Sequence, residues 1–526
     1  PAGFVDSIEV TTGGASAIYG SDAIAGVANI ILERNMEGVE VDARYGWADA
    51  SGERETTLEL TMGRNFDNDR GNIMVALSYD HETAVYADET RPDSLRTDDW
   101  SGNGEYNDYS LTSYIPGGRF ESDDAWNVDG VWYNDKSLAP DDGRNPSVGF
   151  ETALDGWNYR PGRTLSPEVT AYTAAARGRY ELTPRIEVFA DLLWSRVDSL
   201  YEGSYESAIY STDIGPIGNT FDIGQISSSN PFIPAAVEET RSGSVSWYRR
   251  FVEVGQETRD NERETMRFAT GLTGELGETW QWNAFATYGR FEQNQIQGNN
   301  LNYLNIHYAL DVESDGAGGY QCADAGARAD GCIPLNIFGE GSITPEMADY
   351  IRIDGHVQQI REQTVIGGSM DGELFDAPAG AVSAAFGLEW REETQDTNVD
   401  AIILEETTSL SVIPEIEASF DVVEAFAEVE IPLLETVTAQ LAARVADYST
   451  IGTISSYNVG GYWEPTDTLR FRTQYSRSQR APTITEFYSA PRQDADDLRD
   501  PCDGLRPDGS GVTAPPGTGF DPAVIA

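Results

Sequence analysis

Apolar and polar residues alternate along many separate stretches of this 526-residue chain. Val188, Ala190 and Leu192, for example, alternate with Glu187 and Asp191. A period of two is typical of β-strands whose two faces meet different surroundings. The polar face carries charges of both signs, which favours a wet interior, whereas alternation alone is also typical of a one-sided soluble sheet. Aromatic residues recur near the ends of the apolar stripes, at Trp47, Tyr172, Tyr180, Trp194, Trp280, Tyr288 and Tyr475.

These features together predict an all-β fold, a transmembrane antiparallel β-barrel with aromatic girdles. The connections support it, because short turns alternate with long polar insertions, as they do in outer-membrane barrels, where the long loops lie outside the cell. The short turns are 183–184, 277–279, 376–380, 432–436 and 465–467, and the insertions are 83–170, 200–262, 294–360, 397–415 and 479–526. A compact soluble domain rarely carries several structureless loops of this length.

The order of turns and loops gives a strand count. We expect about thirteen membrane strands, with 245–258 assigned to an extracellular hairpin, because otherwise the 294–360 loop would face the periplasm. A plugged transporter barrel has about 22 strands. The chain is therefore expected to be a fragment.

The composition is strongly acidic, with 88 Asp and Glu against 35 Lys and Arg and a formal charge of −53. Phosphate recognition requires basic patches, so a nucleic-acid partner is not expected. The charge suits a surface that collects cations or long loops kept in water, and it is equally consistent with plain solubility. No apolar run approaches the roughly 18 residues of a transmembrane helix.

The chain has three cysteines and three histidines. No histidine is spaced near a cysteine, so no metal site is expected. Cys322 and Cys332 share one Gly/Ala/Asp-rich stretch and are predicted to form a disulfide, with two free buried thiols as the alternative. Asp311–Gly316 lacks the terminal Glu of a calcium loop and is interpreted as a solvated acidic loop. Serine, histidine and acidic residues do not cluster, so neither catalysis nor a cofactor is expected.

The stretch Ile8–Leu32, IEVTTGGASAIYGSDAIAGVANIIL, reads as a strand, tight turns at glycines and a second strand. It resembles the last part of the plug domain of TonB-dependent outer-membrane receptors, whose pattern is roughly I-E-V-x-R-G-P-x-S-x-x-Y-G-x-x-A-x-x-G-x-x-N-I-I. Thr12 stands where that family usually has Arg, and Gly14 where it has Pro. The resemblance assigns a structural role in the plug motif to Gly13, Gly14, Ser16, Tyr19, Gly20, Gly26 and Asn29.

The resemblance implies a division into residues 1–37, the C-terminal part of a plug, and 38–526, a partial barrel with long extracellular loops. It also implies active uptake of a scarce nutrient (a siderophore, cobalamin or an oligosaccharide) across the outer membrane of a Gram-negative bacterium. TonB, with ExbB and ExbD, would supply the energy to a monomer embedded in outer-membrane lipid. The alternatives are a passive porin or adhesin barrel and a secreted β-rich glycan-binding protein or glycosidase.

Two further motifs resemble the family. Arg480-Ala481-Pro482, followed by Glu486, resembles its signature after a barrel strand, where a barrel carboxylate meets a plug arginine. Since Thr12 replaces the usual arginine, we hypothesise that Arg34 pairs with Glu486 or another interior carboxylate; the alternative is a solvated surface Glu. The cysteine loop and the Thr12-Gly13-Gly14 variant resemble a subgroup often associated with carbohydrate or other nutrient uptake. Cys502 is expected to pair with a cysteine beyond Ala526.

Aromatic residues in the 99–135 loop are weak candidates for ligand binding. They could stack on a sugar or another flat ligand, or pack the loop on itself. The candidates are Trp100, Tyr106, Tyr109, Trp126 and Trp132.

Overall fold

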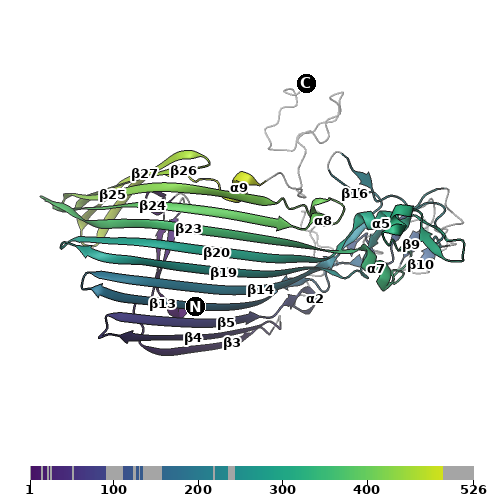
Figure 1. Ribbon diagram of the computed structural model, residues 1–526, viewed down its shortest axis with the longest axis horizontal. Helices are drawn as coiled ribbons and strands as arrows, with labels where there is room; N and C mark the ends of the chain where they lie inside the picture. The colour runs from purple at the N-terminus through teal and green to yellow at the C-terminus, as the bar shows by residue number, and fades with distance from the viewer. Residues whose placement is uncertain are drawn as a thin grey trace, which may run out of the picture.

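A single large antiparallel sheet dominates the computed structural model (Figure 1). The residues that the structure describes are 2–12, 16–20, 23, 26–49, 52–90, 111–121, 126–128, 131–133, 157–216, 219–234 and 243–489. The sheet has thirteen strands in chain order, each hydrogen-bonded to the next. They are β3 (Gly38–Trp47), β4 (Arg54–Phe66), β5 (Gly71–Glu82), β13 (Glu168–Thr183), β14 (Ile186–Tyr205), β19 (Gln256–Leu276), β20 (Trp280–Leu301), β23 (Arg352–Ala377), β24 (Gly380–Val399), β25 (Ile416–Leu434), β26 (Val437–Tyr448), β27 (Gly452–Thr466) and β28 (Leu469–Arg477).

The predicted all-β class and the count of about thirteen strands are confirmed. The segment 245–258 was expected to stay outside the barrel wall. Its first part, β18 (Ser246–Arg250), pairs with two short strands in a separate sheet, and its end, from Gln256, belongs to β19. No helix in the described part of the chain is long and apolar enough to cross a membrane, which says nothing about crossing by strands.

The two faces of the curved sheet differ as the alternation predicts. On the outer face Leu192, Leu388 and Leu441 leave 48%, 67% and 42% of their surface exposed. Val188 lies on the same face as Leu192, and Ala284 shares a row with Leu388 through Gly368. The inner face carries buried polar side chains instead, among them Asn72, Arg179, Glu424 and Arg444. An apolar outer and a polar inner face are what a barrel in lipid requires.

The strands run further than the apolar stripes do, which corrects the expected loop bounds. Residues 256–262, 294–301 and 352–360 were expected in the long polar insertions, outside the membrane strands, yet they are the ends of β19, β20 and β23. Along residues 256–262 both faces of β19 are polar, so the sequence there loses its period of two while the backbone ladder continues. Cross-strand ion pairs such as Arg196–Glu262, at 2.7 Å, replace the apolar contacts there.

The described residues of the insertions between the long strands form a lobe at one end of the sheet (Figure 1). Its core buries Phe120, Trp247, Phe251, Ile306 and Ile337 almost completely. The described parts of these insertions are therefore packed structure where the sequence predicted loops. The shorter elements between the long strands are β6 (Val85–Tyr86), α2 (Ala87–Thr90), β7 (Leu111–Thr112), β8 (Arg119–Glu121), β9 (Trp126–Val128), β10 (Val131–Tyr133), β11 (Trp157–Asn158), β12 (Thr164–Ser166), β15 (Ser207–Ile209), β16 (Asp213–Ile214), β17 (Phe221–Asp222), β18, α5 (Tyr303–Leu310), β21 (Val312–Ser314), β22 (Tyr320–Cys322), α6 (Ala325–Ala329), α7 (Pro345–Ile351) and α8 (Ala401–Leu404).

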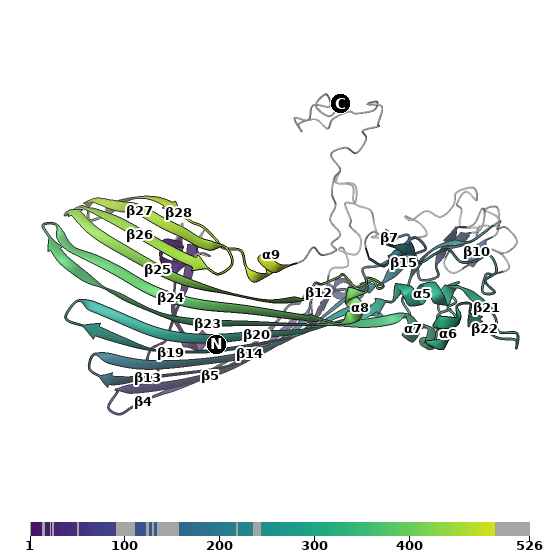
Figure 2. The same ribbon diagram turned by 45° about the horizontal axis from the view of Figure 1, so that its top comes forward.

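The N-terminal segment crosses the inner face of the sheet (Figure 2). It comprises the short helix η1 (Ala2–Phe4), the antiparallel pair β1 (Val5–Thr12) and β2 (Gly26–Leu32), and α1 (Ser16–Tyr19) between them. α1 contacts β25, β26 and β27, whereas η1 contacts β4 near the opposite edge. Only the concave face can be touched at both of these places by one short segment. After β28, α9 (Ile484–Tyr488) completes the described elements.

Candidate functional site

One end of the N-terminal segment is held by its backbone carbonyl groups. Arg177 Nη1 donates to the carbonyl of Glu33 at 3.3 Å, and Arg179 Nε donates to that of Arg34 at 3.0 Å. Asn72, directly opposite Arg179 in the register of β5 and β13, donates from Nδ2 to the carbonyl of Met36 at 2.9 Å. Three inward side chains of the wall therefore fix residues 33–36, whatever side chains those residues carry.

Arg34 does meet an interior carboxylate, but it is Glu187 at 3.0 Å and not Glu486. Glu187 lies on β14 and also pairs with Arg179 at 2.8 Å. The side chain of Arg34 is 69% exposed, whereas that of Arg179 is 7% exposed. Exposed ion pairs contribute little and buried ones depend strongly on both partners, so Arg179 is the stronger anchor.

Glu486 has local partners, which explains why it does not reach Arg34. Its carboxylate accepts from Arg480 Nη2 at 2.6 Å and from the backbone nitrogen of Thr483 at 2.8 Å, completing a capping box at the start of α9. The hydrogen bond from Arg480 lowers the pKa of Glu486 to about 2. The Arg480 motif therefore caps a helix in this structure, as capping boxes do.

The other end of the N-terminal segment lies over a buried ion pair of the wall. Arg444 Nε donates to Glu424 Oε2 at 2.5 Å, and the Glu424 side chain is only 3% exposed. A Cβ at Gly20 would stand 3.7 Å from Arg444 Nη2, and Gly20 has φ +102°, a conformation that favours glycine. The segment therefore approaches the Arg444–Glu424 pair at Gly20, where it has no side chain.

Between its two ends the segment packs on apolar residues and leaves a cavity. Phe4 is buried against Met74, Ala76 and Ala175 of the wall. Beside this contact lies a cavity of about 420 Å³, lined by Phe4, Val5, Ile30 and Leu32 of the segment and, among others, Asp191 and Arg267 of the wall. The contact is thus partly apolar and incompletely filled.

The other plug-motif residues are placed as follows. Ser16 is buried in α1, Tyr19 ends the same helix, and Gly26 starts β2 with φ +156°. Asn29 is exposed and lies opposite Glu9 in the β1–β2 register. Gly13 and Gly14 lie outside the described residues.

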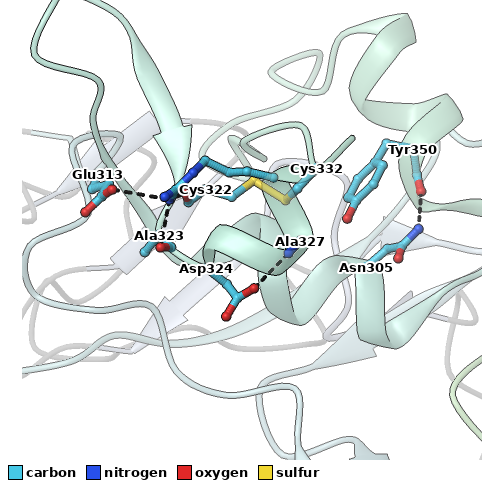
Figure 3. The surroundings of a disulfide bond; sticks show 9 residues. Asn305, Glu313, Cys322, Ala323, Asp324, Ala327, Cys332 and Tyr350 are labelled. Atoms are coloured by element: carbon cyan, nitrogen blue, oxygen red, sulfur yellow. Dashed lines mark hydrogen bonds and ion pairs between the residues drawn. A yellow bond between two sulfur atoms is a disulfide. The ribbon is translucent and has the colours of Figure 1, made fainter. Parts of the chain in front are cut away.

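Cys322 and Cys332 are joined by a disulfide in the lobe (Figure 3). The bridge closes a short loop around α6, whose N-terminus is capped by Asp324 Oδ1 accepting from the Ala327 nitrogen at 2.7 Å. Arg328 Nη1 donates to the carbonyls of Cys322 and Ala323 at 2.5 and 2.8 Å. The disulfide therefore lies in a hydrogen-bonded part of the lobe.

Arg249 is a structural residue that the sequence analysis missed. It is completely buried in the lobe, where Nη1 donates to the carbonyls of Ile337 and Gly339 at 2.6 and 3.0 Å and Nη2 pairs with Glu253 at 2.6 Å. Burial lowers the pKa of Arg249 to about 10. The only signal in the sequence is its place between Tyr248 and Arg250 in a strand-like run, and arginine there reads as a surface residue.

The weak ligand candidates stay predictions. Trp100, Tyr106 and Tyr109 lie outside the described residues, and Trp126 and Trp132 belong to the β9–β10 hairpin. Within the described ranges no group of three or more His, Cys, Asp or Glu could hold a metal ion.

A family model for the β-barrel of TonB-dependent receptors matches residues 194–522, more than half of the chain. The chain belongs to the TonB-dependent receptor family. This family consists of receptors and transporters, not of a class of enzymes.

Solved structures of siderophore receptors are similar to this chain. The siderophore receptor PirA from Acinetobacter baumannii is 12% identical with a TM-score of 0.46, covering 92% of this chain and 49% of that one. A mutant of the ferric enterobactin receptor PfeA from Pseudomonas aeruginosa is 13% identical with a TM-score of 0.48, covering 92% and 50%. FpvA from P. aeruginosa, bound to ferric pyoverdine, is 9% identical with a TM-score of 0.45, covering 90% and 46%. The chain thus spans about half the length of these receptors.

Proposed function

We propose that this receptor actively imports a scarce nutrient ligand across the outer membrane of a Gram-negative bacterium, driven by TonB with ExbB and ExbD. The observation that carries the proposal is the N-terminal segment, which lies across the inner face, is hydrogen-bonded to wall side chains at residues 33–36 and contacts β25, β26 and β27 through α1. A segment in that place blocks the interior, so transport requires that it be moved. The outer membrane has no ATP, and a mechanical partner is a reasonable source of the work.

The same proposal covers the division of the chain. Residues 1–37 would be the C-terminal part of a plug and residues 38–526 a barrel wall whose lobe faces outside the cell. The protein would be a monomer, and its exposed apolar rows of Leu192, Leu388 and Leu441 would contact the surrounding lipid. A porin would not need the anchored segment, and a secreted glycan-binding protein would not expose these apolar rows to water.

The ligand stays open between a siderophore, cobalamin and an oligosaccharide. Growth of a deletion strain is compared on iron chelates as the sole iron source, on cobalamin as the sole source of that vitamin and on glycans as the sole carbon source. The compound on which the strain fails to grow identifies the ligand class. Uptake of the identified compound should then stop in a strain that lacks TonB and should return with the intact gene. Uptake that continues without TonB would contradict active import and support a passive pore.

A further inference from the structure

An apolar groove lies in the outer face of the wall. It crosses β20, β23, β24 and β25, which are neighbours in the sheet (Figure 1), and its volume is about 830 Å³. Large side chains of the outer face border it, among them Trp282, Ile366, Phe386, Leu388 and Trp390. Leu388 is one of the exposed apolar residues that mark this face. This feature is called the outer groove below.

Three glycines make the wall thin at this place. Gly367 faces inward, and a Cβ there would lie 2.8 Å from the Phe285 ring. Gly387 also faces inward, and a Cβ there would lie 2.5 Å from the Phe426 ring. Gly368 faces outward instead, and a Cβ there would first meet a backbone oxygen of β20 at 2.9 Å. The inner side is thus filled by aromatic rings, whereas the outer side at Gly368 is the floor of the groove. A glycine inside a strand often marks a place where a ligand comes close to the backbone.

Aromatic rings close the end of the outer groove that lies away from the lobe. The Trp280 and Phe386 rings are 5.8 Å apart between their centroids. The Trp280 ring covers Gly372, where a Cβ would stand 2.7 Å from it. The Trp282 ring covers Gly274 in the same way, at 2.8 Å. The groove is therefore bounded at this end by side chains that are packed on strands, so its shape is set before anything enters it.

The opposite end of the groove reaches the polar boundary of the outer face. Trp390 lines this end, and two residues nearer the lobe Glu392 lies opposite Asp421 in the register of β24 and β25. Tyr288 of β20 lies at the same level, and its hydroxyl donates to Glu362 at 2.6 Å. Aromatic residues are expected at such a boundary between an apolar band and water. The outer groove therefore lies within the apolar band, in the half nearer the lobe.

An acyl chain of a membrane lipid fits this groove in chemistry and in length. From Phe386 to Trp390 the groove follows β24 for about 13 Å, and half of the hydrocarbon core of a bilayer is about 15 Å thick. Inside a bilayer apolar surfaces gain nothing from leaving water, so association depends on van der Waals contact. An unfilled groove loses those contacts, and a flexible chain that enters it restores them.

We propose that the outer groove holds one acyl chain of a lipid from the leaflet on the lobe side, so that the receptor carries one bound lipid at a fixed place. The chain would fill the wall from outside at Gly368, as Phe285 and Phe426 fill it from inside at the neighbouring glycines. Its end would lie against the aromatic rings near Phe386, and its headgroup would lie at the level of Tyr288. This inference goes beyond the proposed uptake function and depends neither on the imported ligand nor on TonB.

The test is native mass spectrometry of the purified full-length receptor in detergent, titrated with dimyristoyl phosphatidylethanolamine. We expect one lipid molecule to be retained at concentrations at which further molecules are not. Ala425→Phe places a ring in the groove and should weaken the binding of that first lipid at least about tenfold, since the loss of about ten van der Waals contacts has this effect. Leu388→Ala removes a bordering side chain, should act in the same direction and replaces Ala425→Phe if that variant does not fold.

Ala443→Phe is the matched control, because Ala443 is exposed on the same face of the neighbouring β26 but does not line the groove. It should retain the first lipid like the wild type. The inference is overturned if the wild type binds lipids in a series with no tighter first molecule, or if Ala425→Phe, folded as judged by its heat-modifiable migration on a gel, retains that molecule like the wild type. A receptor dimer that Ala425→Phe dissociates would also overturn it, because a second copy would then fill the groove. Uptake without TonB would contradict the proposed function alone.

Discussion

Removing the Arg179 side chain should loosen the N-terminal segment far more than removing that of Arg34. In Arg179→Met the segment loses the hydrogen bond to the Arg34 carbonyl and the contact with Asn35, and Glu187 loses its buried partner. A hydrogen bond to a charged group contributes about 1.5–3 kcal/mol, and breaking a buried pair costs about 3–5 kcal/mol. Since Arg34 still neutralises Glu187 in part, we expect a loss of about 3 kcal/mol in the stability of the docked segment.

Arg34→Met should cost less than about 1 kcal/mol, because the Arg34 guanidinium is exposed and its pair with Glu187 is screened by water. The Arg34 carbonyl, which Arg179 binds, remains in that variant. The comparison therefore separates the exposed ion pair from the buried anchor in the same few residues.

Hydrogen exchange of the β1 and β2 amides in the detergent-solubilised receptor measures this difference. A loss of about 3 kcal/mol corresponds to exchange faster by about two orders of magnitude in Arg179→Met. Arg185→Met, at the exposed β13–β14 turn, is the control and should exchange like the wild type. Equal acceleration in Arg34→Met and Arg179→Met, or none in Arg179→Met, would refute the reasoning.

Three further outcomes follow from the structure. Serine at Cys322 and Cys332 should destabilise the lobe by about 2–3 kcal/mol, because a short closed loop is lost, and limited proteolysis should then cut the lobe and spare the wall strands. Burial and the nearby Glu257 raise the pKa of Glu206 to about 7. Since this folded-state pKa lies above the unfolded value, the stabilisation of the lobe by protonated Glu206, about 1–3 kcal/mol, is complete below about pH 4.5 and is lost as the pH rises through about 7. Hydrogen exchange of the lobe from pH 5 to 8 should show this loss in the wild type but not in Glu206→Gln. Leu441→Arg, on the exposed apolar face, should reduce folding into lipid vesicles by about 2–4 kcal/mol, and Gln440→Arg, on the opposite face, should not; equal effects would contradict the assignment of faces.

The strands could be predicted from the sequence as far as their two faces meet different surroundings. Leu192, Leu388 and Leu441 belong to stripes that alternate because one face is apolar and the other polar. The same rule fails at residues 256–262, where both faces of β19 are polar and only the backbone ladder with β14 and β20 defines the strand.

The sequence could predict that Arg34 of the N-terminal segment pairs with an interior carboxylate, but not which one. An interior carboxylate for Arg34 was expected, but its identity depends on the register of β13 and β14, which brings Glu187 within reach from 153 positions away. Glu486 was a plausible partner until its role at the start of α9 was visible. Arg249 could not be recognised, because nothing in its neighbourhood of the sequence shows that three insertions close over it.

The wall holds residues 33–36 by hydrogen bonds to peptide oxygens, so the sequence of these residues can diverge between receptors without loss of the contact. Carbonyl groups are common to all amino acids, so substitutions at Glu33 or Met36 leave the acceptors of Arg177 and Asn72 in place. The side chains of the N-terminal segment could thus change to suit another ligand while its backbone stays docked in the same position. A chimaera carrying residues 1–37 of a distant relative on this wall should, on that ground, still dock.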